Sequence, residues 1–192
     1  VLFSFAIMPQ NSHLRPRDIS QSIQIRAEIP QDYSAVEHLT EQAFGHTAEA
    51  EIVRRVRKES ALHPISLVAV RDQMIVGHVL FSKISLSETQ ASDLLFGLGP
   101  VSVHPKHQRQ GIASSLIREG LAKCELRGSL ACFVLGSPAY YQRFGFQNAY
   151  QAGFWYNKDE DNPAFQVNFW GNAGLHLPPS EARYADVFYL AD

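Results

Sequence analysis

The segment from Val101 to Ala113, which reads Val-Ser-Val-His-Pro-Lys-His-Gln-Arg-Gln-Gly-Ile-Ala, constrains the fold of this chain more than any other. Its pattern predicts a strand that passes through a loop at 104–108 into a helix. The first turn of a helix has unpaired N–H donors and a positive dipole end, so it can bind a phosphate without a cationic side chain. Gly111 lets an anion approach closely, and Arg109 can add a charge-assisted contact. We therefore expect a phosphate-binding turn here.

The strand before this turn is expected to be irregular. It runs from Leu95 to Val103 and contains Gly97, Gly99 and Pro100. Proline inside a strand removes a donor from the hydrogen-bond ladder, so a bulge or a local opening of the sheet is predicted. The helix after the turn should be amphipathic, with a buried stripe formed by Ala113, Leu116, Ile117, Gly120, Leu121 and Cys124.

The N-terminal half predicts one strand, two helices and a hairpin. Residues 23–27 alternate as in a strand, and Asp32 is expected to cap a helix that ends at Gly45. A second helix from about Thr47 ends in a basic cluster, which we interpret as a solvated face, with attraction of substrate or cofactor phosphate as the alternative. Its members are Arg54, Arg55, Arg57 and Lys58. Residues 67–70 and 75–86 predict an antiparallel hairpin.

The C-terminal half predicts a short strand at 130–135 and then a helix that ends at Gly145, with Ser137 as its N-cap. A last strand is expected around Val187 and Tyr189. The aromatic residues in between are expected to pack in the core, with an acceptor pocket as the alternative. They are Phe154, Trp155, Tyr156, Phe165, Phe169 and Trp170.

Strands and helices alternate around the central strand, turn and helix, which indicates an α/β or α+β sandwich with a mixed sheet. The 192 residues, of which 45% are hydrophobic, suit one domain over 23–192. Residues 1–22 are expected to be a flexible tail without an export signal.

Charge and cysteine content exclude several classes of protein. The net charge of -2 gives no general attraction to nucleic acid or to an anionic membrane, and no apolar run reaches the length of about 20 residues that crosses a bilayer. Cys124 and Cys132 are the only cysteines, and we interpret them as inert core thiols in a reducing compartment such as the cytoplasm. His104 and His107 have no third ligand at a recognisable spacing, so no metal site is expected.

Other phosphate-binding motifs fit less well. A Gly-x-x-x-x-Gly-Lys motif is absent, which disfavours a P-loop nucleotide triphosphatase. Gly97 and Gly99 lie inside a strand and lack the third glycine of a dinucleotide-binding fingerprint, which disfavours a Rossmann enzyme.

The chain resembles the GNAT N-acetyltransferases in two motifs. Gln108, Gly111 and Ala113 match the family pattern of Gln or Arg, two residues, Gly, one residue, then Gly or Ala. The later Tyr-Tyr-Gln-Arg-Phe-Gly-Phe at 140–146 is similar to the family's aromatic signature, and the likeness extends from about Ile23 to Tyr150. The resemblance implies a mixed, mostly antiparallel sheet, flanked by helices and splayed at its central strands.

The resemblance also implies the chemistry, in which an amine directly attacks the thioester of acetyl-coenzyme A (acetyl-CoA) in a ternary complex. Tyr141 would protonate the departing thiolate, with its neighbour Tyr140 as the rival. The strand backbone would bind the pantetheine arm and the turn would hold the pyrophosphate. These cofactor-binding residues are Val101, Ser102, Val103, Gln108, Arg109, Gln110, Gly111, Ile112, Ala113 and Ser114.

Several points stay open from the sequence. The asparagine that many family members have before the tyrosine helix is missing, and Ser137 is either its substitute or only a helix cap. The general base is Glu37, Glu41, His78, His104 or a water chain. The acceptor is a small-molecule amine or a protein amino group, and the chain is a monomer or a homodimer. The alternative functions are a non-catalytic CoA-binding regulatory module and a transferase for a longer acyl or aminoacyl donor.

Overall fold

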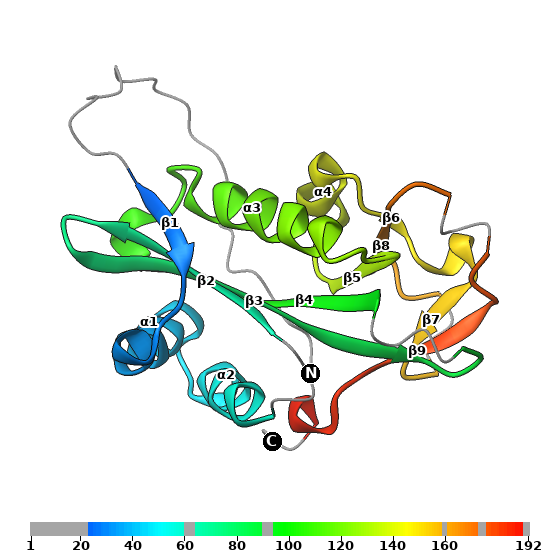
Figure 1. Cartoon of the computed structure of the whole chain (residues 1–192), viewed down its shortest axis with the longest axis horizontal. Coiled ribbons are helices and arrows are strands. Elements are labelled where there is room, and N and C mark those ends of the chain that lie inside the picture. Colours follow the sequence, from blue (N-terminus) through cyan, green and yellow to red (C-terminus); the bar gives the residue numbers. More distant parts are fainter. Residues whose placement is uncertain (1–22, 60–63, 90–93, 159–160, 173–175, 190–192) are drawn as a thin grey trace.

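A computed structural model describes residues 23–59, 64–89, 94–158, 161–172 and 176–189, so the tail expected at 1–22 lies outside the described residues. Its main feature is a nine-stranded mixed sheet (Figure 1). The strands are β1 (Gln24–Ala27), β2 (Ile65–Arg71), β3 (Met74–Leu86), β4 (Leu95–Val103), β5 (Ala131–Leu135), β6 (Gln147–Asn148), β7 (Phe154–Tyr156), β8 (Phe165–Phe169) and β9 (Ser180–Tyr184).

Strand order in the sheet is β1-β2-β3-β4-β5-β8-β6, and β9 pairs with both β3 and β7. Among the strand pairs of the described residues, β4–β5 and β7–β9 are parallel and the other six are antiparallel, which confirms the expected mixed, mostly antiparallel sheet. Helices α1 (Tyr33–Phe44) and α2 (Ala48–Lys58) lie on one face, whereas α3 (Ile112–Leu126) and α4 (Pro138–Tyr141) lie on the other (Figure 1).

The β2–β3 hairpin forms as predicted, through a two-residue turn. Asp72 and Gln73 both have positive φ, at 49° and 64°. Two successive left-handed residues match the right-handed twist of an antiparallel pair. The turn therefore returns the chain beside β2 and brings Met74 opposite Arg71.

Strand β4 opens the sheet in the middle of the molecule. Its parallel pairing with β5 ends at Leu98 opposite Val134. On the other side, Phe81 pairs with Leu98 and Val79 pairs with Val101, so β4 has one residue more than β3 between these two pairs. This irregularity at residues 99–100 confirms the predicted bulge and the splayed central strands.

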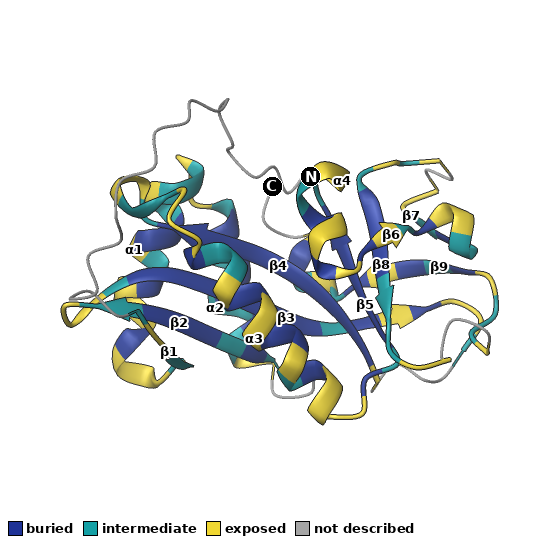
Figure 2. Cartoon of the chain, turned by 90° about the horizontal axis from the view of Figure 1, so that it is seen from above, coloured by how far each residue is buried: buried dark blue, intermediate teal, exposed yellow. Residues whose placement is uncertain are grey.

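The core is divided between the two faces of the sheet, and most strand residues are buried (Figure 2). On the α1 and α2 face, Val53 and Val56 join the buried rings of Phe133, Phe154 and Phe165. On the α3 face, Leu116 and Ile117 pack with Phe81 and Phe144, and a Cβ added at Gly120 would lie 2.0 Å from the Phe81 ring.

The predicted core role of the C-terminal aromatic residues is confirmed for five of the six. Phe154, Tyr156 and Phe165 are buried, and the half-buried Phe169 and Trp170 pack against the two core clusters, whereas Trp155 is half-buried outside them. The prediction of a strand around Val187 and Tyr189 is wrong, because residues 186–188 form a 3₁₀ turn. The last strand in the described part of the chain is β9, in which inward Ser180, Ala182 and Tyr184 alternate with more exposed polar residues. Because its inward positions include small and polar residues, the alternation of hydrophobic and polar residues typical of a strand is not visible in the sequence.

Two expected helix caps are absent. Asp32 immediately precedes α1, but its carboxylate accepts hydrogen bonds from Arg26 and from the Ile29 N–H instead of capping the helix. Ser137 is the N-cap residue of α4, yet its hydroxyl makes no capping bond. The N–H of Tyr140, one of the two that an N-cap side chain can accept from, is bonded to the Ser137 carbonyl at 3.0 Å instead.

Candidate active site

Two left-handed residues shape the turn between β4 and α3. Arg109 has φ of 61°, and Gly111, the N-cap of α3, has φ of 84°. The first helical hydrogen bond runs from the Ser115 N–H to the Gly111 carbonyl at 3.0 Å. The N–H groups of residues 112–114 therefore precede the helical ladder, at the positive end of the dipole. The turn thus has the donors that bind phosphate.

Two glutamine side chains hold this turn together. Gln108 Nε2 donates to the Val103 carbonyl at 3.2 Å, and Gln110 Nε2 donates to the Lys106 carbonyl at 3.4 Å. Both side-chain amides are thus used to hold the loop. The Gln108 N–H donates to the Pro105 carbonyl at 3.5 Å, so of this pair the Gln110 N–H is the donor that a phosphate could use.

The predicted residues of β4 point to different faces of the sheet. Val101 and Val103 pack in the cluster beneath α3, whereas the buried Ser102 hydroxyl donates to Thr40 of α1 at 3.1 Å. Because β5 stops pairing at Leu98, the β4 backbone beyond this residue borders the opening of the sheet. Ser102 therefore has only its backbone to offer to that opening.

Tyr141 lies on α4, just after β5, and is 3% exposed. Its ring fills the space beside Gly136, where an added Cβ would lie 2.5 Å from it. Burial raises the pKa of the Tyr141 hydroxyl well above its usual value, and the nearby Tyr140 and Cys132 add to this. The hydroxyl is therefore protonated throughout the neutral range and can act as a proton donor.

Tyr140 links the two motifs of the site. Its hydroxyl forms a hydrogen bond with Ser114 in the first turn of α3, and its ring meets that of Tyr141 edge to face at 5.1 Å. Burial raises the pKa of Tyr140, and the bond to Ser114 opposes that effect. The fold thus places the predicted phosphate-binding turn, Tyr140 and Tyr141 in one contiguous region.

A separate hollow of about 770 Å³ lies outside this region, and no predicted site residue lines it. Its walls come from the end of α2, from β3 and β9, and from the turn after β9. The lining residues are Glu59, Ser85, Asn157, Glu181, Arg183, Tyr184, Ala185, Asp186, Val187 and Tyr189.

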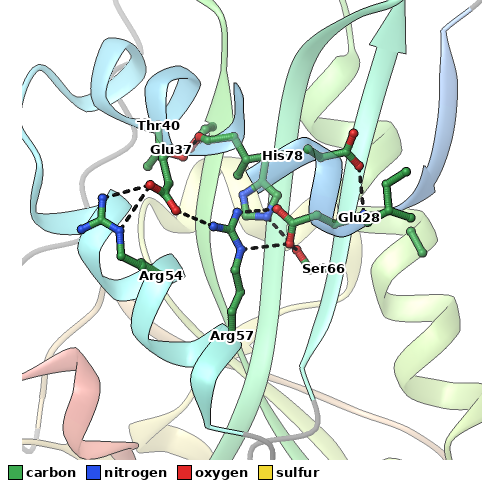
Figure 3. A network of polar contacts seen from close by, with 12 residues as sticks. Glu28, Glu37, Thr40, Arg54, Arg57, Ser66 and His78 are labelled. Carbon is green, nitrogen blue, oxygen red and sulfur yellow. Dashed lines mark hydrogen bonds and ion pairs between the residues drawn. The ribbon is translucent and has the colours of Figure 1, made fainter. Parts of the chain in front are cut away.

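A buried ionic network joins α1 and α2 to the first strands (Figure 3). Arg57, whose side chain is 7% exposed, pairs with Glu28 and donates to Glu37 at 2.8 Å. Arg54 donates to the other oxygen of Glu37 at 2.9 Å. The interpretation of the basic cluster as a solvated face is therefore wrong for Arg57, because its buried guanidinium forms ion pairs with two carboxylates.

The same network extends to His78. Ser66 Oγ donates to Glu28 at 2.7 Å and lies 2.8 Å from His78 Nε2. Because the single hydroxyl proton goes to Glu28, His78 must carry its proton on Nε2 and donate to Ser66. Burial, with the charge of Arg57 as a second cause, lowers the pKa of His78 to about 3. His78 is neutral at pH 7 and is a poor general base.

This buried histidine predicts a steep loss of stability in acid. The pKa of His78 is about 3 in the folded chain and 6.5 when exposed, so between these values only the unfolded state gains the proton. The free energy of unfolding should fall by about 1.4 kcal/mol per pH unit below 6.5 because of this residue. Urea unfolding of the parent and of His78→Gln, measured from pH 7 to 4, checks this: the parent should lose stability more steeply by that amount, and equal slopes would contradict it.

The two cysteine thiols lie in the packed core on the α3 face of the sheet. Cys124 and Cys132 are buried, and burial raises the pKa of Cys124 to about 12, so both thiols are inert as expected. Across the described ranges, no group of three or more His, Cys, Asp or Glu side chains could hold a metal ion. Among the same residues, no helix is both long and apolar enough to span a bilayer.

Sequence reasoning placed Arg57 on a solvated helix face and did not single out Arg71, and the structure connects both arginines to the site or its supports. Arg57 follows the inward Val56 in a basic run that looks like a helix end. Arg71 precedes the hairpin turn, and its side chain bonds to Gln110 at 2.7 Å. Neither contact had a local signal, because Glu28 and Glu37 lie 29 and 20 positions from Arg57, and Gln110 lies 39 positions from Arg71.

Comparison with known proteins gives a consistent picture. The family model described as an acetyltransferase (GNAT) domain matches residues 24–149. The protein named uncharacterized N-acetyltransferase YhbS from Escherichia coli K12 is 36% identical over 166 residues, which are 85% of this chain and 97% of that protein.

Solved structures agree with the sequence matches. A crystal structure of YhbS from Escherichia coli in complex with CoA matches with a TM-score of 0.82 and 30% sequence identity. The match covers 91% of this chain and 96% of the YhbS chain. The crystal structure of a GNAT family acetyltransferase from Brucella melitensis in complex with acetyl-CoA matches with a TM-score of 0.72 and 35% sequence identity. The match covers 87% of this chain and 98% of the Brucella chain.

Proposed function

This chain belongs to the GNAT acetyltransferase family, and from that premise we propose that it acetylates a primary amine by direct transfer in a ternary complex. It is an acyltransferase whose cosubstrate is acetyl-CoA. The observation that carries the proposal is the position of the 108–114 turn beside the opening between β4 and β5. Acetyl-CoA supplies a thioester, whose carbonyl carbon is open to attack by nitrogen.

The residues of the turn fit the pyrophosphate of this cosubstrate. The N–H groups of residues 112–114 lie ahead of the helical ladder, and the left-handed Gly111 has open space where a side chain would begin. Exposed Arg109 adds a positive charge next to them. The β4 backbone beyond Leu98 would hold the pantetheine arm and the acetyl carbonyl, since its edge toward β5 is released from pairing there.

Proton transfers complete the reaction. As the new C–N bond forms and the C–S bond breaks, Tyr141 gives its hydroxyl proton to the departing sulfur, and the amine loses a proton to a base. Two of the four side-chain candidates for that base fit poorly: His78 has its pKa lowered to about 3, and Glu37 is paired with Arg54 and Arg57. Glu41, His104 or a water chain would take the amine proton.

The amine acceptor is a small molecule or a protein amino group. Free thiol release from acetyl-CoA, screened across a library of amines and basic peptides, tests the proposal directly. At least one acceptor should release CoA in proportion to acetylated product identified by mass spectrometry. Binding of acetyl-CoA without turnover on any acceptor would favour a non-catalytic regulatory module, and faster turnover with a longer acyl-CoA would favour the other donor class.

Replacing Gly111 tests the phosphate-binding turn itself. Acetyl-CoA should raise the melting temperature of the parent, because it binds the folded state. Gly111→Asp should abolish the shift, since a negative charge enters the phosphate site. Gly111→Asn is the matched control: it has the same shape, and both residues tolerate the left-handed backbone. Asn should keep part of the shift, and an undiminished shift in the Asp variant would place the phosphate elsewhere.

A further inference from the structure

Arg71, at the end of β2, connects the β2–β3 hairpin to the phosphate-binding turn. Its Nη1 donates to Gln110 Oε1 at 2.7 Å and lies 3.2 Å from His107 Nδ1. The hairpin holds Arg71 opposite Met74, and the His104 N–H bonds to the carbonyl of Val76 at 3.0 Å. The guanidinium therefore comes from a paired end of the sheet and bonds across to the loop that precedes α3.

The turn needs such support because of its backbone. Arg109 is not glycine, yet it has φ of 61°. A left-handed backbone at a residue with a Cβ costs about 1 to 3 kcal/mol and persists only where its surroundings hold it. Gln110 follows Arg109 directly, and its amide both accepts from Arg71 and donates to the Lys106 carbonyl. Gln110 thus bonds to the chain on two sides, at the point where the turn changes direction.

His107 completes the support. Burial lowers the pKa of His107, and the charge of Arg71 lowers it further. A neutral imidazole leaves Nδ1 free to accept from the guanidinium. The His104 ring stands edge to face against that of His107 at 5.4 Å. Arg71 thus contacts the loop at two residues, one on each side of Gln108.

We infer that Arg71 is a positioning residue for the cosubstrate: it holds Gln110 and His107, and through them keeps the 108–113 turn in its phosphate-binding conformation. This inference rests on the proposed function, since it assumes that the turn binds the pyrophosphate of acetyl-CoA. Loss of Arg71 should therefore lower the affinity for the cosubstrate and leave the rate of the transfer step unchanged, because Arg71 acts through the turn.

Substitution of Arg71 tests the inference by calorimetry and kinetics. Arg71→Met removes the contacts but keeps an extended side chain, and it should weaken binding of acetyl-CoA about 10-fold, the equivalent of one charge-assisted hydrogen bond. The KM for acetyl-CoA should rise with it, whereas kcat at saturation should stay within about two-fold. Arg183→Met, at an exposed arginine of β9, is the control for loss of a charge and should bind acetyl-CoA like the parent.

A double-mutant cycle separates support of the turn from simple attraction by charge. If Arg71 acts through Gln110, the combined Arg71→Met and Gln110→Ala variant should bind little more weakly than either single variant. Arg71→Lys keeps the charge, but a lysine Nζ ends one bond short of the Nη1 that makes both contacts, so it should not restore parental affinity. Additive losses in the cycle, or full affinity of Arg71→Lys, would overturn the positioning role. A parent that fails to bind acetyl-CoA would instead refute the proposed function.

Discussion

Tyr141→Phe should lower kcat by about 10² to 10⁴, the usual loss when an acid catalyst is removed. The ring stays, so its packing beside Gly136 and in the α3 cluster is kept. Only the hydroxyl is lost, and the raised pKa of this buried group keeps its proton available for the departing sulfur. The dissociation constant for acetyl-CoA, measured by calorimetry, should change little, because protonation of the thiolate matters in the transition state.

Tyr140→Phe provides the matched control, and the structure gives it a different expected effect. The Tyr140 hydroxyl is bonded to Ser114, beside the proposed phosphate site, so its loss should act on cosubstrate affinity more than on kcat. A large loss of kcat in Tyr140→Phe with a fully active Tyr141→Phe would reverse the assignment. Two fully active variants would mean that solvent protonates the thiolate.

Arg57→Met should lower the free energy of unfolding by about 3 to 5 kcal/mol, the cost of removing one partner from a buried ion pair. Glu28, with a side chain 3% exposed, would be left in the interior without its main cation, and Glu37 would keep only Arg54. Methionine fills a similar volume, so the effect is electrostatic. Urea unfolding at pH 7 gives the difference.

Two comparisons make this prediction specific. Arg55→Met removes a half-exposed pair with Glu51 on the same helix and should cost less than about 1 kcal/mol. Adding Glu28→Gln and Glu37→Gln to Arg57→Met should recover part of the lost stability, because uncharged side chains cost less to bury. Equal losses in Arg57→Met and Arg55→Met would contradict the buried network as a source of stability.

Local patterns in the sequence were sufficient for the elements around the site. The hairpin follows from two apolar runs around a polar turn, and the end of α1 at Gly45 follows from a left-handed C-cap. The bulge in β4 was signalled by Gly99 and Pro100. Each of these features is governed by residues within a few positions of one another. Strand β9 was missed because its inward positions include a serine and an alanine, which carry little hydrophobic signal.

For the site, the sequence by itself determined the glycine turn before α3 and the tyrosine helix, and predicted phosphate binding at the turn, because glycine, helix-start and aromatic patterns are local and the two motifs match one family. Only the tertiary structure decided which partners these residues have. Arg57 is buried, His78 is neutral, and Arg71 bonds to Gln110, because segments 12 to 39 positions apart meet in the fold. The charge state of a buried side chain depends on its neighbours in space, and residue type and spacing alone do not specify those neighbours.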